Sequence, residues 1–167
     1  FFFNNNDIRK ILKPLYKFQY IYFTGITLSL FESKNFINFI KFLTQLKKKQ
    51  IKIIFDLNIR IKRWSKKKLI LHFSKTLPLV DILFASGEDL NFWKGKNTLK
   101  TFENIIQKYD IPHAIYRNNA KFNYSFYDNE RYIVKNKIIN NVVDTSGAGD
   151  GYNAAYLSNF TKYNNSF

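Results

Sequence analysis

Short apolar runs of strand length alternate with longer amphipathic stretches between Asp7 and Arg117. In Ser33–Lys49 the apolar residues recur at helical spacing, whereas Ile51–Phe55 is an almost continuous apolar run. Such alternation predicts a parallel sheet with helices packed on its faces. The expected strands are Tyr20–Phe23, Ile51–Phe55, Asp81–Ala85 and His113–Arg117; the expected helices are Asp7–Lys17, Ser33–Lys49, Ser65–Leu77, Glu88–Lys94 and Thr98–Tyr109, with Thr24–Thr27 as a loop.

The pattern changes after Arg117. Lys121–Tyr127 and Arg131–Lys135 flank the turn-forming residues 128–130, which predicts a hairpin. Lys137–Val143 is then expected to form one more strand. We therefore predict an α/β fold with a mainly parallel sheet, helices on both faces and a small antiparallel meander, without internal repeats or a linker.

The composition limits the class of protein. Of the 167 residues, 46% are apolar, which is too many for a disordered chain. No apolar run approaches the 18 or so residues of a membrane span. The absence of cysteine favours a cytoplasmic setting. The chain contains no methionine and starts with Phe1, so a fragment of a longer protein is expected.

The net charge of +15 raises the question of nucleic-acid binding. However, the chain is rich in Lys, Asn, Ile, Phe and Tyr together, the set encoded by A+T-rich codons. The lysine runs 47–49 and 66–68 lie on expected helix surfaces, where solvated faces are usual. We therefore predict no specific nucleic-acid partner and no membrane partner.

A glycine-rich turn stands near the C-terminal end, at Asp144–Gly151, and a stretch of helical character follows it from Tyr152 to about Phe160. A turn that leads into a helix gathers free backbone N–H groups, and the helix dipole adds positive potential, so the turn suits an anion. Gly147 and Gly149 permit backbone angles that other residues avoid. Asp150 at the helix entrance can cap N–H groups or accept a proton. The alternative is an ordinary strand-to-helix turn with an aspartate cap.

A second polar segment, Asp56–Arg60, directly follows an expected strand. Polar side chains at the carboxyl end of a parallel strand lie where open α/β sheets bind ligands. The planar fork of Arg60 suits a carboxylate, although a surface ion pair is the alternative. Asp56 could instead cap the following turn, and Trp64 is expected to pack in the core. His72 and His113 are isolated in the sequence, so we expect structural or surface roles and no metal site.

Four stretches together resemble the ribokinase-like (PfkB) family of carbohydrate kinases. Asp144–Leu157 resembles its glycine-rich signature, Tyr22–Leu28 its Ser/Thr-Gly-Ile loop, and Asp81–Glu88 its following strand and acidic loop. The segment Phe55–Arg60 with Trp64 is most similar to 2-keto-3-deoxygluconate kinases. The resemblance implies a ribokinase-like three-layer sandwich and the ATP-dependent phosphorylation of a sugar or sugar acid, best matched by 2-keto-3-deoxygluconate giving its 6-phosphate.

The resemblance also implies roles for individual residues. Asp150 would be the base that deprotonates the sugar hydroxyl, and the amides of Gly147, Ala148 and Gly149 would form the anion hole. Asn58 would lie near the ATP phosphates, and Arg60 would bind the sugar acid. The segment Arg117–Lys121 departs from the family, because it stands in the place of a glycine-containing nucleotide loop, but Arg117 could still reach an ATP phosphate. Asp144 and Thr145 would lie by a site for K⁺, while Mg²⁺ would arrive with ATP.

Compared with the family, residues 1–167 are expected to form one partial kinase domain. Two parts would be absent: the N-terminal sugar-binding and lid part, and the final part of the adenine pocket. A homo-oligomer could form through the lid. Two alternatives stay open: a decayed, non-catalytic domain of the same fold, and a kinase for another sugar such as fructose or ribose.

Overall fold

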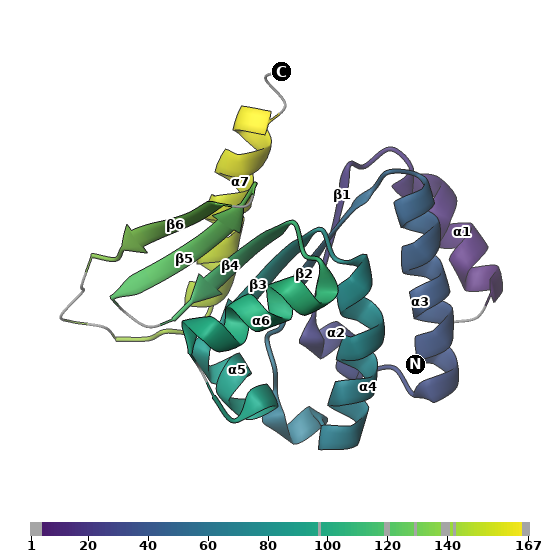
Figure 1. Ribbon diagram of the computed structural model, residues 1–167. Helices are drawn as coiled ribbons and strands as arrows, with labels where there is room; N and C mark the ends of the chain where they lie inside the picture. The colour runs from purple at the N-terminus through teal and green to yellow at the C-terminus, as the bar shows by residue number, and fades with distance from the viewer. Residues whose placement is uncertain are drawn as a thin grey trace. The chain divides into compact units, whose positions relative to one another are not determined.

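The computed structural model describes residues 5–96, 98–118, 121–128, 130–137, 141 and 143–164. The chain divides into two compact units, Phe1–Asn136 and Lys137–Phe167. The first unit contains a six-stranded sheet with its connecting helices, and the second contains one long helix (Figure 1).

The sheet follows the order of the chain, β1-β2-β3-β4-β5-β6. Strands β1 to β4 are parallel, and β5 and β6 are added antiparallel as a hairpin. The register aligns Thr24 with Asp56 and Ser86 with Arg117, so these strand ends lie along one edge. The strands are β1 (Tyr20–Thr24), β2 (Lys52–Asp56), β3 (Ile82–Ser86), β4 (His113–Arg117), β5 (Phe122–Tyr127) and β6 (Glu130–Lys135).

The helices of the first unit confirm most of the expected elements. They are α1 (Asn5–Leu15), α2 (Gly25–Ser29), α3 (Ser33–Lys48), α4 (Lys66–Thr76), α5 (Gly87–Lys94) and α6 (Leu99–Tyr109), with short 3₁₀ turns at Ile61–Arg63 and Leu77–Leu79. Ser65 and Thr98 cap α4 and α6 by accepting backbone N–H groups of the first turn. Helix α1 ends one residue after Pro14, short of the expected Lys17, because proline cannot continue the hydrogen-bonding pattern.

Two expected elements are wrong or incomplete. Thr24–Thr27 was expected as a loop, but α2 begins there because the Thr24 hydroxyl accepts the Ile26 N–H at 3.2 Å and caps a helical turn. In the expected strand Lys137–Val143, the described residues Lys137, Asn141 and Val143 are not in a strand. Residues 138–140 and 142 lie outside the described part.

The core of the first unit lies between one face of the sheet and the connecting helices. Alternate residues of neighbouring strands belong to a single buried cluster with α3, α4, α5 and α6. Right-handed connections between parallel strands that follow the chain order place all connecting helices on the same face, so the connections of the first unit do not supply the helices that were expected on both faces. Much of this core is aromatic: Phe55 and Phe73 meet edge to face, and Phe73 also contacts Trp64 and Trp93. The core holds the carboxyl ends of β1 to β4 in a fixed register.

The second unit is dominated by α7 (Ala148–Asn164). Three aromatic rings at i, i+4 spacing, on Tyr152, Tyr156 and Phe160, stack along it with centroids 6.3 and 6.5 Å apart. Within the described residues, no helix of either unit combines the length and apolar character that crossing a membrane requires.

Candidate active site

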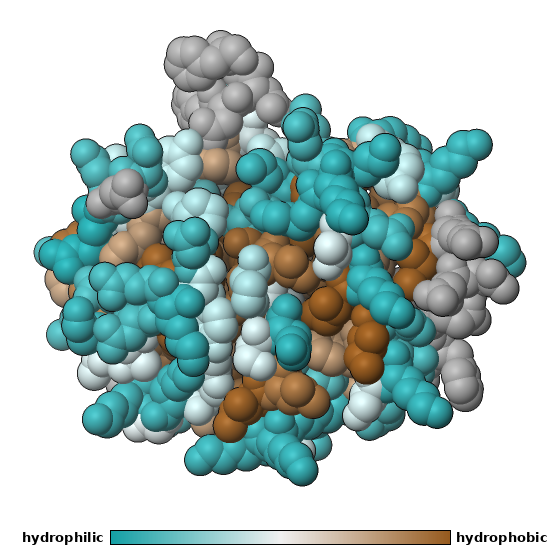
Figure 2. Space-filling model, turned by 45° about the vertical axis from the view of Figure 1, so that its right-hand side comes forward, coloured by the Kyte–Doolittle hydropathy of each residue, from teal (hydrophilic) through white to brown (hydrophobic). Residues whose placement is uncertain are grey.

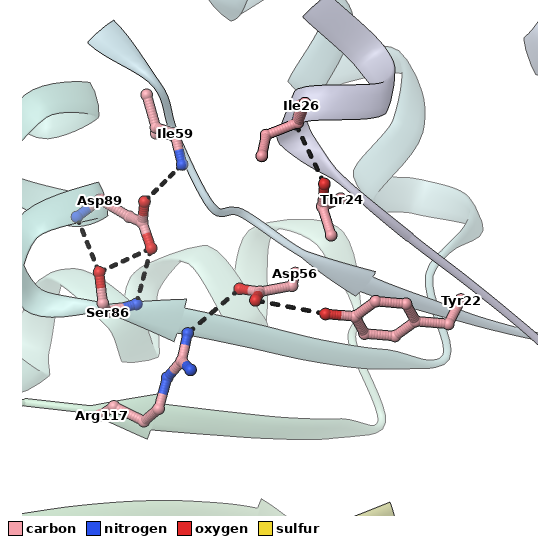
Figure 3. A network of polar contacts seen from close by, with 8 residues as sticks. All are labelled: Tyr22, Thr24, Ile26, Asp56, Ile59, Ser86, Asp89 and Arg117. Atoms are coloured by element: carbon pink, nitrogen blue, oxygen red, sulfur yellow. Dashed lines mark hydrogen bonds and ion pairs between the residues drawn. The ribbon is translucent and has the colours of Figure 1, made fainter. Parts of the chain in front are cut away.

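The carboxyl ends of the four parallel strands carry separate groups of hydrogen-bonded polar side chains (Figure 3). Thr24 ends β1, Asp56 ends β2, Ser86 ends β3 and Arg117 ends β4. Parallel strands bring these ends to the same edge, where open α/β sheets bind their ligands. The structure therefore brings together, within the first unit, the predicted residues of the β2 loop and Arg117.

Asp56 lies at the centre of this edge and is 1% exposed. Its Oδ1 accepts a hydrogen bond from Arg117 Nη2 at 3.3 Å, and its Oδ2 accepts one from the Tyr22 hydroxyl at 3.4 Å. The aspartate therefore serves as counter-ion to Arg117. Among the described residues, the buried Arg117 Nε has no hydrogen-bond partner. A buried guanidinium N–H without a partner is costly, so an acceptor that reached this donor would stabilise it.

The loop after β2 carries the predicted ligands Asn58 and Arg60. Asn58 is half-buried and has a φ of 30°, a conformation that few non-glycine residues adopt. Arg60 is exposed, and no acidic side chain among the described residues lies within ion-pair distance of it. The alternative of a surface ion pair is therefore not realised in this part of the chain, and the guanidinium is free to meet a ligand.

Gly25 supports this loop from the side of α2. A Cβ atom on Gly25 would lie 2.0 Å from the Leu57 carbonyl oxygen and 3.4 Å from that of Asn58. Such a contact is far inside van der Waals range and involves backbone atoms that cannot rotate away. The glycine is therefore required by the close approach of α2 to the Leu57–Asn58 backbone.

We expect Gly25→Ala to lower the free energy of unfolding by about 1–3 kcal/mol, because the added methyl group forces backbone shifts. Urea denaturation measures this change. The matched control is Gly151→Ala, where nothing lies within 4 Å of the added Cβ. Because alanine favours a helix over glycine, the control is expected to raise the free energy of unfolding by up to about 1 kcal/mol. Equal stability of the wild type and Gly25→Ala would contradict the described packing.

The turn after β4 is held by a buried tyrosine. The Tyr116 hydroxyl donates to Asn118 Oδ1 at 2.9 Å, and burial, with a smaller contribution from Tyr124, raises the pKa of Tyr116 to about 12. The phenol is therefore a neutral donor at physiological pH. A Cβ on Gly87 would lie 2.8 Å from the Asn118 carbonyl oxygen. The hydrogen bond of Tyr116 holds Asn118, next to Arg117, and the close approach of the Asn118 backbone requires glycine at position 87.

The remaining predicted site residues belong to the second unit. Helix α7 begins at Ala148, earlier than the expected Tyr152, so Asp150 lies in its first turn and is exposed. The Ala148 N–H donates to the Thr145 carbonyl at 3.1 Å, and the Gly151 N–H donates to the Gly147 carbonyl at 2.8 Å. The N–H groups of Gly149 and Asp150 lie in the first turn of α7, where no carbonyl group of the helix can accept them, and they point out of the helix end. This geometry fits an anion.

The expected role of the glycines is correct in part. Gly147 has a φ of 74°, which favours glycine over any other residue. Gly149 lies inside α7 and is not among the described glycines with positive φ, so the expectation of an unusual backbone angle there is wrong. The reason is that the helix starts at Ala148, which gives Gly149 ordinary helical angles.

Asp144 shapes the turn that Thr145 continues. Its Oδ1 accepts the Ser146 N–H at 2.8 Å, and the hydrogen bonds from Ser146 lower the pKa of the Asp144 carboxyl group below its usual value. The carboxylate is therefore used, at least in part, to close an Asx-type turn ahead of Gly147.

The aromatic and histidine residues near the sheet are structural, as expected. Trp64 is 7% exposed and packs edge-on against Phe73 and His72. Burial lowers the pKa of His72 and of His113 to about 4, so both rings are neutral at physiological pH. No group of three metal-binding side chains occurs among the residues that the structure describes.

Sequence reasoning gave no individual role to Asp89, Gly25 or Tyr22, although Asp89 and Gly25 lie against the loop after β2 and Tyr22 donates to Asp56. For Asp89 a signal exists in the spacing Ser86-x-x-Asp89, which is typical of a capping box. Gly25 and Tyr22 lie in the Tyr22–Leu28 motif, but their contacts are made with the segment of β2 and the loop after it, and the motif does not predict those partners.

The chain is similar to known proteins in both sequence and fold. The model described as "pfkB family carbohydrate kinase" matches residues 1–166, which include both units. The chain is 31% identical over 161 residues to the 2-dehydro-3-deoxygluconokinase of Haemophilus influenzae, covering 93% of this chain and 51% of that protein.

Two solved structures share the fold. A PfkB family carbohydrate kinase from Listeria grayi has a TM-score of 0.75 and 24% identity, over 96% of this chain and 52% of its own. A putative ribokinase II from E. coli, solved in complex with ATP and Mg²⁺, has a TM-score of 0.73 and 20% identity, over 89% of this chain and 47% of its own.

The chain spans about half the length of these relatives. The neighbours confirm the predicted ribokinase-like α/β fold, and the match of the family model extends across the sheet and the glycine-rich turn alike. On these grounds the chain belongs to the PfkB family of carbohydrate kinases.

Proposed function

We propose that the whole protein transfers the γ-phosphoryl group of ATP to a hydroxyl group of a sugar acid, best matched by 2-keto-3-deoxygluconate. The observation that carries this proposal is the first turn of α7, where the carboxylate of Asp150 and outward-facing backbone amides share one helix end. A base beside an anion-binding helix terminus is the pair that phosphoryl transfer to an alcohol requires.

In the proposed reaction, Asp150 accepts the proton of the sugar hydroxyl group. The oxygen of that hydroxyl group forms a bond to the γ-phosphorus. The bond between that phosphorus and the bridging oxygen of ADP breaks, and ADP leaves with the electron pair. The amides of Gly147, Ala148 and Gly149 hold the negative charge that develops on the transferred group. The Ala148 N–H already donates to the Thr145 carbonyl oxygen. To donate to the transferred phosphoryl group as well, it must break this bond or share its hydrogen between the two acceptors.

The edge of the sheet supplies the binding groups in this proposal. Arg117 offers its free Nε–H to the phosphates, and Asn58 lies on the neighbouring loop. The exposed fork of Arg60 would take the substrate carboxylate in a bidentate contact. This contact is the reason to prefer a sugar acid over a neutral sugar such as fructose or ribose.

The cations follow from the same chemistry. The described part of the chain contains no group of three carboxylate or histidine side chains that could bind a metal ion. Mg²⁺ would therefore be held mainly by the ATP phosphates, as it commonly is. Bound there, it neutralises phosphate charge. The turn at Asp144 and Thr145 presents carboxylate and carbonyl oxygens, the ligand type that suits K⁺.

Both units are proposed to belong to one kinase domain, completed by parts of the protein that this chain does not include. The similarity to a 2-dehydro-3-deoxygluconokinase supports the choice of substrate. A decayed domain that binds nucleotide without turnover is the second candidate, favoured only by the departure of the Arg117–Lys121 segment from the family pattern.

An ADP-release assay of the full-length protein tests the proposal. We expect turnover with 2-keto-3-deoxygluconate to exceed turnover with fructose and ribose, and Arg60→Ala to raise the KM for the sugar acid by about 10- to 100-fold, since one charge-assisted contact is lost. As the matched control, Arg63→Ala on the adjacent 3₁₀ turn removes an equal charge and should leave KM within about twofold. Nucleotide binding without turnover on any sugar would favour the decayed domain.

A further inference from the structure

One buried carboxylate outside the predicted site touches the loop of Asn58 and Arg60. Asp89 lies in the first turn of α5 and is 6% exposed. Its Oδ1 accepts the Ile59 N–H at 2.7 Å, and its Oδ2 accepts the Ser86 N–H at 3.0 Å and the Ser86 hydroxyl at 2.7 Å. Figure 3 shows the two oxygens turned toward these two different partners.

We propose that Asp89 is a positioning residue, which fixes the loop after β2 so that Arg60 and Asn58 keep the place they need to meet the substrate. The link to a substrate rests on the proposed function, whereas the hold on the loop does not.

A capping function alone does not account for both oxygens. The capping box between Ser86 and Asp89 uses only Oδ2 and the Asp89 N–H. The remaining oxygen reaches a residue 30 positions away in the sequence, on a different loop. This second contact does not cap α5. It holds the backbone of the loop after β2 at Ile59.

The loop after β2 is held on both sides of Asn58 by residues of β3 and the helix α5 that follows it. The Leu57 N–H donates to the Phe84 carbonyl at 3.0 Å, and the Ile59 N–H donates to Asp89 at 2.7 Å. Between these two bonds Asn58 has its positive φ of 30°. A conformation of this kind persists only where the surroundings enforce it. Without the Asp89 contact, one of the two bonds that enforce it is lost, and the chain beyond Asn58 is free to move.

Only a carboxylate can satisfy this arrangement. The Ile59 N–H and the Ser86 N–H are both donors, and an ionised carboxyl group accepts at both oxygens. The amide of Asp89→Asn must turn its NH₂ toward one of these two N–H donors. A matched control exists in Ser86→Ala, which removes the hydroxyl of the capping box and leaves the Ile59 contact in place.

Amide hydrogen exchange on the folded full-length protein tests the hold on the loop. We expect Asp89→Asn to speed exchange at Ile59 about tenfold, the loss of roughly one hydrogen bond, and Ser86→Ala to leave it within about threefold. Equal acceleration in both variants would reduce Asp89 to a helix cap and overturn the proposal. Asp89→Glu retains both acceptors and serves as the second variant should Asp89→Asn fold poorly; slow exchange at Ile59 supports the proposal, and fast exchange overturns it.

A double-mutant cycle tests the link to the substrate. We expect Asp89→Asn to lower kcat/KM for the sugar acid about tenfold, mainly through KM, in the wild-type background. In the Arg60→Ala background the same change should cost little more, because the group that Asp89 positions is already gone. Additive losses would show that Asp89 acts through overall stability and would overturn the positioning role.

The two hypotheses fail in different ways. If the wild-type protein phosphorylates no sugar, the proposed function fails, and the exchange rates at Ile59 alone decide for or against the role of Asp89. If the protein is active and the exchange at Ile59 is the same in Asp89→Asn as in the wild type, the proposed function stands and the positioning role is overturned.

Discussion

Replacing Asp150 by asparagine is expected to lower kcat of the full-length protein by about 100- to 10,000-fold, which is the usual contribution of a general base to the rate. The side chain lies in the first turn of α7, beside the free amides, and is exposed. Asparagine keeps its size and can still cap the helix, but it cannot take a proton from the sugar hydroxyl. A coupled assay of ADP release measures the loss.

Binding must survive this change for the interpretation to hold. Calorimetry should give the same affinity of Asp150→Asn for ATP within about threefold, because the amides remain in place. Asp128→Asn, just after β5, is the matched control: it also removes the charge of an exposed aspartate, its φ of 53° is tolerated by asparagine, and we expect a much smaller effect on kcat. Unchanged turnover in Asp150→Asn would remove Asp150 from the catalytic step.

The second large effect concerns the stability of the sheet edge. We expect Asp56→Ala to lower the free energy of unfolding by about 3–5 kcal/mol, because it leaves the guanidinium of Arg117 largely buried without its counter-ion. The two side chains are 2% and 16% exposed, so solvent screens the pair only weakly. Chemical denaturation followed by circular dichroism measures the change.

A double variant separates the ion pair from the other contacts of Asp56. Asp56→Ala combined with Arg117→Met removes both charges and fills the space of the arginine with an apolar chain. We expect it to recover at least about half of the lost stability, since replacing both members of a buried pair is often close to neutral. A double variant as unstable as Asp56→Ala would assign the loss to the Tyr22 contact or to packing.

The sequence was sufficient to predict most of the first unit because its elements are local in origin. Apolar periodicity predicts β2 and α3, and capping residues such as Ser65 and Thr98 mark where helices begin. The position of Asp56 at the carboxyl-terminal edge of the sheet, with Arg60 on the loop that follows, was also predictable, because the carboxyl ends of parallel strands meet.

The parts that could not be predicted depend on contacts between distant segments. The pairing of Asp56 with Arg117 joins residues 61 positions apart, and that of Asp89 with Ile59 joins residues 30 apart. Helix α2 forms where a loop was expected, and Gly25 faces the Leu57 carbonyl in a way that only the folded chain reveals. In each case a local pattern exists, but its partner is set by the register of the sheet.

The last strand of the sheet has a consequence for handling the protein. Every residue of β6 is exposed, including Tyr132, Ile133 and Val134, and β5 is its only strand partner among the described residues. A strand of this kind can template pairing with other chains and so lead to aggregation. Glu130 and Arg131 at one end and Lys135 at the other act as gatekeepers, since charges that flank an apolar run oppose stacking. These three charged side chains, which have no place in the proposed chemistry, therefore oppose aggregation through this strand.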